Sequence, residues 1–209
     1  MRKLVKRMVD VSMPALMMYL MSYQSIRGLF WHARAGIALF LLFFIHHALN
    51  AKWYTTLAKG TCTFRRVVVT ASNFLLTGVM VVMMLSSLMM SGGVFAFVSI
   101  PMTEIGRKLH VTSTAWGYLL MAFHTGLHIT MIIHRMYKRI RGTHFSFLYY
   151  AGYALCIGLG VISFQQSGLA NDLVMHNDSF NPTPSPWGFF VRLFAIFIAM
   201  CLLTHLLFQ

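Results

Sequence analysis

Two histidine pairs with equal spacing are the residues of this chain best suited to do chemistry. His32 and His46 lie 14 residues apart, and the same 14 residues separate His110 from His124. In an α-helix this spacing makes nearly four turns, so the members of a pair share one face and stand about 21 Å apart. A neutral imidazole is a good axial ligand for haem iron. Two neighbouring helices carrying these pairs would hold two iron centres at different heights.

The segments that carry the pairs are strongly apolar. Hydrophobic residues make up 58% of the 209 residues and charged residues 10%, which is too apolar for an ordinary soluble domain. Runs long enough to cross about 30 Å of hydrocarbon occur six times. They cover residues 8–26, 33–57, 67–90, 111–133, 145–167 and 187–208. We therefore predict an all-α integral membrane bundle of six transmembrane helices, forming one domain over residues 1–209.

The basic residues indicate how this bundle is oriented. With the N-terminus in the cytoplasm, 12 of the 17 lysines and arginines lie on the inner side, which is the positive-inside pattern. Both termini are then cytoplasmic, and the second and fourth helices run in the same direction. His32 is therefore expected level with His110 near the outer surface, and His46 level with His124 nearer the inner one. Membrane topology explains the net charge of +13 without nucleic-acid binding.

Acidic residues are nearly absent from the apolar segments. The chain has four, Asp10, Glu104, Asp172 and Asp178, and none is predicted in the middle of a span. A cation-coupled transporter usually needs a buried carboxylate, and a carboxylate-bridged di-iron site needs several. Histidine is therefore the only ionisable residue type predicted at depth.

The inner pair has two histidine neighbours that leave its chemistry open. His47 follows His46 directly and points about 100° away from it, and His128 lies one turn beyond His124. Helical H-x-x-x-H pairs also bind zinc and other transition metals. The sequence thus allows haem ligation by His46 and His124 with His47 and His128 as alternates or supporting neighbours. It also allows a non-haem metal cluster of all four, or histidines that only pack.

Basic residues near each predicted iron centre are candidates to bind haem propionates. The outer candidates are Arg34, Arg107 and Lys108, and the inner ones are Arg65 and Arg66. Interfacial anchoring is the alternative role for each of these side chains.

Small residues in two predicted helices indicate close approach. Gly36, one turn beyond His32, would let either a porphyrin edge or another helix approach the backbone. Ala154 and Gly158 are predicted to be helix-packing contacts.

The cysteines limit the type of haem. Cys62, Cys156 and Cys201 form neither a C-x-x-C pair nor a C-x-x-C-H motif, so covalent c-type haem and iron–sulfur clusters have no support. Two haem b groups are therefore the expected cofactors. The chain also lacks a glycine-rich nucleotide-binding fingerprint, which makes a quinol the first candidate for electron donor and a separate cytoplasmic reductase the alternative. No catalytic residue is assigned.

Two longer runs resemble a known family. They are HHALNAKWY at 46–54, followed by KG at 59–60 and NFLL at 73–76, and the run 110–128 with AWG at 115–117 and MAFHTGLH at 121–128. These runs resemble the flavinylation-associated transmembrane cytochromes of bacteria, formerly catalogued as a domain of unknown function. The likeness extends from His32 to about Arg135. That family usually has an acidic residue after its first histidine motif, whereas Ala33 and Arg34 follow His32 here.

This resemblance implies a di-haem, cytochrome b-like domain that carries electrons across the bacterial cytoplasmic membrane. It implies an extracytoplasmic acceptor that often carries flavin, so the chain would be an electron-transfer subunit of a membrane oxidoreductase. Its expected partners are membrane lipid, quinol and an extracytoplasmic flavoprotein or other redox protein. Whether the chain itself oxidises quinol stays open. A histidine-lined metal-ion transporter and a non-redox membrane subunit are the alternatives.

Overall fold

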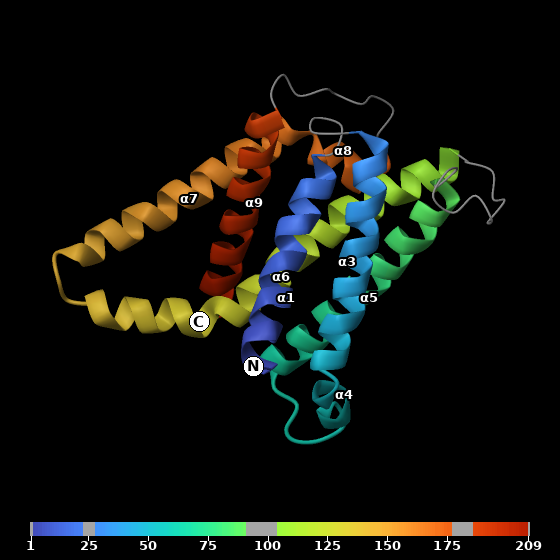
Figure 1. Cartoon of the computed structure of the whole chain (residues 1–209). Helices are drawn as coiled ribbons and strands as arrows, with labels where there is room; N and C mark the ends of the chain where they lie inside the picture. The colour runs from blue at the N-terminus through green and yellow to red at the C-terminus, as the bar shows by residue number, and fades with distance from the viewer. Residues whose placement is uncertain (1, 23–27, 91–103, 177–185, 209) are drawn as a thin grey trace.

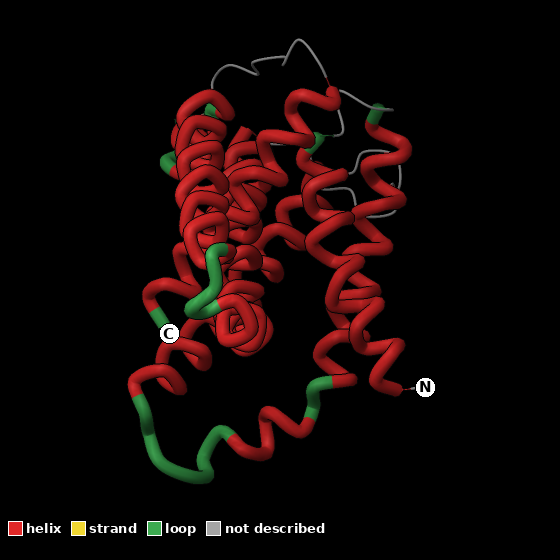
Figure 2. The backbone as a smooth tube through the Cα atoms, turned by 90° about the vertical axis from the view of Figure 1, so that its left-hand side faces the viewer, coloured by secondary structure: helices red, strands yellow, loops and turns green. Residues whose placement is uncertain are grey.

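The computed structural model describes residues 2–22, 28–90, 104–176 and 186–208, and all regular structure in these ranges is helical (Figures 1 and 2). The helices are α1 (Arg2–Met21), α3 (Leu29–Leu49), α4 (Lys52–Thr56), α5 (Phe64–Met90), α6 (Glu104–Ile140), α7 (Phe145–Ser167), α8 (Leu169–Leu173) and α9 (Pro186–Leu207). The predicted all-α fold is confirmed for the described ranges. Asp178 and residues 23–26 of the first predicted span lie outside them.

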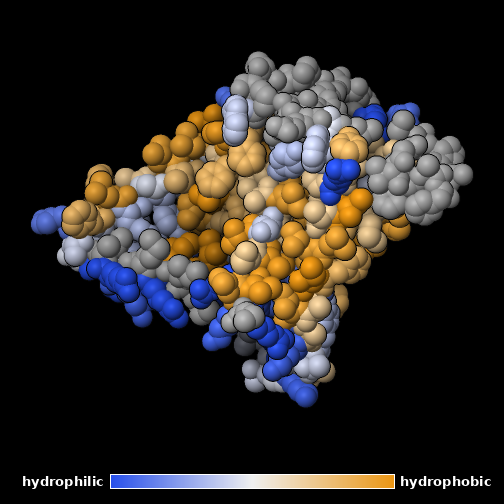
Figure 3. All heavy atoms as spheres, in the orientation of Figure 1, coloured by the Kyte–Doolittle hydropathy of each residue, from blue (hydrophilic) through white to orange (hydrophobic). Residues whose placement is uncertain are grey.

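Four helices are long and apolar enough to cross a membrane, namely α3, α5, α7 and α9. A fifth is α6, if the two parts that meet at 41° near residues 130–133 count as one span. Large apolar side chains on the outside of the four helices, such as Phe44, Phe74, Leu155 and Phe194, are more than half exposed. Figure 3 shows a broad hydrophobic surface above a lower edge where hydrophilic side chains gather. Lipid covers apolar surface on this scale, which indicates a multi-pass membrane protein.

The structure does not support the first predicted span. Its helix, α1, is not apolar enough to cross a membrane, because four of its first six residues are basic and Asp10 follows them. The structure therefore supports four or five spans, and six spans stay a prediction. Both termini lie toward the same end of the bundle (Figure 1).

The second predicted span, residues 33–57, ends earlier in the structure than the hydropathy indicated. The α3 helix stops at Leu49 because Asn50 forms hydrogen bonds with the last carbonyls of the helix. The Asn50 side-chain amide donates a hydrogen bond to the His46 carbonyl at 2.8 Å, and its backbone N–H donates to the carbonyls of His46 and His47. Asparagine favours helix ends because its side chain competes for backbone hydrogen bonds. His46 thus lies in the last turn of α3.

Helix α6 is the centre of the bundle. It packs on α5 along one side and on α9 along another, while α7 packs on α9 and α1 packs on α3. The fully buried Tyr118 of α6 donates a hydrogen bond to the Leu193 carbonyl of α9. A buried hydroxyl needs such a partner, so this bond fixes α9 against α6 in one register.

Close approach of α7 to α9 depends on Gly160. The predicted contacts at Ala154 and Gly158 are wrong, because both residues are exposed. Gly160 is buried instead, and a Cβ built there would lie 2.1 Å from the Ala199 Cβ and 2.9 Å from the Ala195 carbonyl oxygen. The glycine is therefore required by the neighbouring backbone rather than by its own helix.

The variant Gly160→Ala is expected to lower the free energy of unfolding by about 1–3 kcal/mol, since a methyl group is forced into a filled interface. Chemical unfolding in detergent micelles measures this loss. Gly158→Ala is the matched control, because nothing lies within 4 Å of an added Cβ there. Equal destabilisation of the two variants would contradict the role given to Gly160.

Candidate functional site

The outer histidine pair meets between α3 and α6. The ring centroids of His32 and His110 lie 6.1 Å apart, with the ring planes at 74°. Metal–nitrogen bonds of about 2 Å place the centroids of two imidazoles on opposite sides of one metal ion about 6 Å apart. The separation of the rings thus fits two ligands of a single iron.

The space around this pair is not filled by close helix packing. Among the described helices, α3 packs mainly on α1, and the pair α3 and α6 is not closely packed. Nothing lies within 4 Å of a Cβ built on Gly36, one turn from His32. The helix-packing alternative for Gly36 therefore finds no partner among the described residues, and the backbone of α3 is open beside His32.

Neighbouring helices hold the two outer rings. The buried Ser86 of α5 donates its hydroxyl to the Met83 carbonyl at 3.0 Å, and its oxygen lies 3.4 Å from Nδ1 of His110. His32 contacts the backbone carbonyl of Leu20 in α1. A partner on one ring nitrogen fixes the orientation of the other, which is how ligating histidines are usually supported. Nothing in the sequence around Ser86 indicated this role.

The inner histidines lie near one another, on α6 and at the end of α3. The ring centroids of His124 and His128 lie 4.6 Å apart, and His46 and His47 are near enough to influence His124. Nδ1 of His124 is buried and has no hydrogen-bond partner among the described residues. Burying a polar atom without a partner is costly, so this ring is a place where a bound group would be stabilised.

His47 and His128 take different roles from the predicted inner pair. Nδ1 of His47 is hydrogen-bonded to the Tyr54 hydroxyl, and its ring packs on Phe43 with centroids 4.4 Å apart. His128 is exposed. Within the described ranges, no group of three or more histidine, cysteine, aspartate or glutamate side chains is arranged to hold a metal ion. A four-histidine non-haem cluster therefore finds no support.

Asp10 is the site residue that the sequence interpretation missed. Its Oδ1 lies 2.8 Å from Nδ1 of His46, and the two side chains are 39% and 26% exposed. Asp10 lies near the middle of α1, a helix that is not apolar enough to count as a span. The prediction that no acidic residue falls in the middle of a span is therefore not contradicted. The contact of Asp10 with His46 joins two helices, so no signal in the sequence indicated it. The second nitrogen of His46 lies 3.5 Å from the Asn50 amide, at the limit of hydrogen bonding.

The outer basic candidates have other partners in the structure. The Arg34 guanidinium lies over the Phe30 ring of its own helix, 4.0 Å from the centroid. Lys108 forms an ion pair with the exposed Glu104 at 3.2 Å. Arg107 is partly buried on the same turn of α6. These contacts match the anchoring alternative, and propionate binding stays a prediction.

The inner basic candidates differ from each other. Arg65 donates a hydrogen bond to the Leu127 carbonyl of α6 at 3.1 Å and interacts electrostatically with His128, so it lies beside the inner histidines. Arg66 is turned toward α4, where it donates to the carbonyls of Thr56 and Leu57. Of the two, Arg65 is the better placed for an inner propionate.

No protein-family model, curated protein or solved structure matches this chain. The resemblance to flavinylation-associated cytochromes accordingly stays a prediction from the two sequence runs.

Proposed function

We propose that this chain is a di-haem b-type membrane cytochrome, with His32 and His110 as ligands of the outer iron and His46 and His124 as ligands of the inner iron. The observation that supports this best is the 6.1 Å separation of the His32 and His110 rings from two helices that do not pack closely. A structural subunit needs no facing imidazoles within its apolar interior. A transporter needs polar side chains along its path through the membrane, and the apolar spans offer few of them.

The outer pair has the ring separation that two ligands of one iron would need, and His46 and His124 would supply the imidazoles of an inner site. The backbone of α3 is open at Gly36, and the unpaired Nδ1 of His124 is a buried polar atom that a bound group would satisfy. When bound, each haem supplies a one-electron ferric/ferrous couple. Ser86 orients the His110 ring through Nδ1. The Asp10 carboxylate accepts the Nδ1–H of His46, which would leave Nε2 as the nitrogen available to bind an iron.

Two such centres at different depths form an electron path across the bilayer. The 14-residue spacing separates the histidines of one helix by about 21 Å, so two haems held by them would lie at different depths in the bilayer. We propose that electrons enter from quinol in the membrane and leave to an extracytoplasmic, flavin-carrying acceptor. In this proposal both termini lie in the cytoplasm of a bacterium.

A reduced-minus-oxidised visible spectrum of the purified protein, with haem quantified per chain, tests the proposal. Two haem b groups per chain are expected. Bound zinc without haem would favour the metal transporter, and neither cofactor would favour the non-redox subunit.

A further inference from the structure

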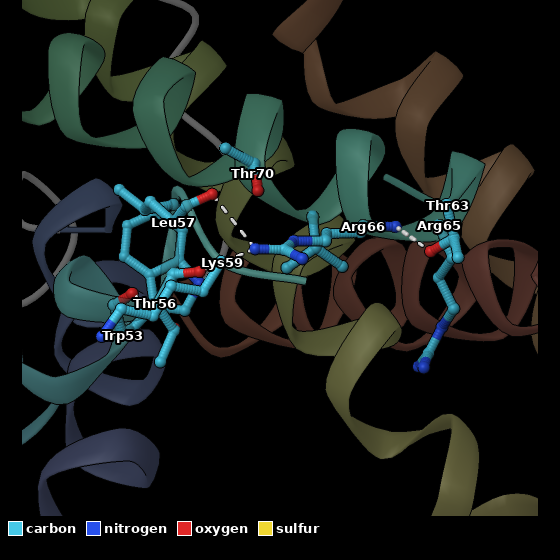
Figure 4. A pocket seen from close by; sticks show the side chains of 9 residues that line it. Trp53, Thr56, Leu57, Lys59, Thr63, Arg65, Arg66 and Thr70 are labelled. Atoms are coloured by element: carbon cyan, nitrogen blue, oxygen red, sulfur yellow. Dashed lines mark hydrogen bonds between the residues drawn. The ribbon is translucent and has the colours of Figure 1, made fainter. Parts of the chain in front are cut away.

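A basic pocket of about 370 Å³ lies where α4 leads into α5 (Figure 4). Three cations line it, Lys59, Arg65 and Arg66, and no acidic side chain is among its lining residues. Arg65 is also the candidate for an inner propionate, whereas Lys59 and Arg66 have no part in the proposed haem sites. The positive charge of the pocket favours an anionic occupant.

Arg66 is held rigidly at the wall of this pocket. Its Nη1 donates to the Thr61 carbonyl at 3.1 Å, and its Nη2 donates to the carbonyls of Thr56 at 2.7 Å and Leu57 at 3.1 Å. Gly60 makes this approach possible, because a Cβ there would lie 3.0 Å from Nη1 and its φ is +88°. Three of five guanidinium N–H donors are used, so two remain for a ligand. A fixed arginine loses little side-chain entropy when it binds an oxyanion.

The first turns of α5 add to this anion-binding character. Arg65 is tied to α6 through the Leu127 carbonyl at 3.1 Å, and Thr70 contributes its side chain to the wall (Figure 4). The positive end of the 27-residue α5 begins at Phe64, beside the cations. Helix N-termini favour phosphate because their first N–H groups and their dipole both point at it.

Three apolar side chains, Trp53, Leu57 and Val69, also line the pocket. A free phosphate would leave them uncovered, whereas a lipid would cover them with its glycerol and acyl chains. Basic pockets at the ends of membrane helices bind anionic lipid headgroups in this manner.

We infer that this pocket binds the phosphate of an anionic phospholipid, whose glycerol and acyl chains lie against Trp53, Leu57 and Val69. Phosphatidylglycerol is the probe of choice because it carries one phosphate diester and one net negative charge. This inference does not depend on haem binding and can be tested whether or not the chain proves to be a cytochrome.

Native mass spectrometry of the full chain, released from nanodiscs of mixed phosphatidylglycerol and phosphatidylcholine, counts the lipids that stay bound. One phosphatidylglycerol per chain is expected to survive delipidation. The variant Lys59→Glu should reduce its retention at least tenfold, because it reverses one of the three charges. Lys52→Glu is the matched control, since Lys52 is exposed on α4 and does not line the pocket. Retained secondary structure by circular dichroism shows that each variant folds.

Three results would overturn the inference. Equal loss of lipid in the two variants would mean that only general surface charge attracts it. Equal retention of phosphatidylcholine would mean that the negative charge is irrelevant. Displacement of the bound lipid by glycerol phosphate at equal concentration would assign the pocket to a soluble phosphate ester instead.

Discussion

Chains carrying His110→Ala are expected to retain one haem where the unaltered protein holds two. The ring centroids of His32 and His110 lie 6.1 Å apart, so removing His110 would take away one of the two proposed ligands of the outer iron. His124→Ala should likewise remove the inner haem and leave the outer one, and the double variant should bind none. Haem extracted and quantified per chain gives the result directly.

The neighbouring histidines provide the controls for this prediction. His47→Ala and His128→Ala should keep two haems, because His47 is engaged by Tyr54 and His128 is exposed. His144→Ala, in the exposed connection before α7, reports any general effect of removing a histidine. Added imidazole should restore the lost haem if the cavity is intact. Loss of haem in His47→Ala together with its retention in His46→Ala would identify His47, rather than His46, as the inner ligand.

The variant Asp10→Asn is expected to weaken the inner haem by about 10–100-fold, the usual effect of removing a partner that orients a ligating histidine. The carboxylate lies 2.8 Å from Nδ1 of His46 and makes the ring a stronger electron donor to a metal on its other nitrogen. A stronger donor stabilises ferric iron. Loss of the charge should therefore raise the potential of the inner haem and leave that of the outer haem unchanged. Haem retention during dilution and a redox titration of both haems measure the two effects.

The matched control for this variant is Glu104→Gln. Glu104 also forms an ion pair, with Lys108 at 3.2 Å, but it is exposed at the other end of α6. Asp10→Glu keeps the charge and should restore part of the affinity. An unchanged inner potential in Asp10→Asn, in a protein that still binds two haems, would show that Asp10 only packs against His46. Absence of haem from the unaltered protein would instead reject the cytochrome assignment.

Helix positions were predictable wherever hydropathy alone decides them. The predicted span 145–167 coincides with α7, and 187–208 differs from α9 by one residue at each end. The prediction failed at residues 33–57 because Asn50 ends α3 by a local hydrogen bond that a hydropathy window does not register. It also placed glycine packing at Gly158, whereas the face of α7 that meets α9 carries Gly160. Which face of an apolar helix meets a neighbour is not visible from its composition.

The candidate site, like the helices, was predictable from the sequence only in part. The sequence by itself determined that two helices carry histidines 14 residues apart on one face, because spacing along a helix is a property of a single segment. Only the tertiary structure decided that His32 meets His110 and that Asp10 meets His46 across 36 residues of sequence. These contacts depend on how α1, α3 and α6 are rotated and packed against one another. That arrangement arises from all the helix interfaces together, so no one segment of the chain specifies it.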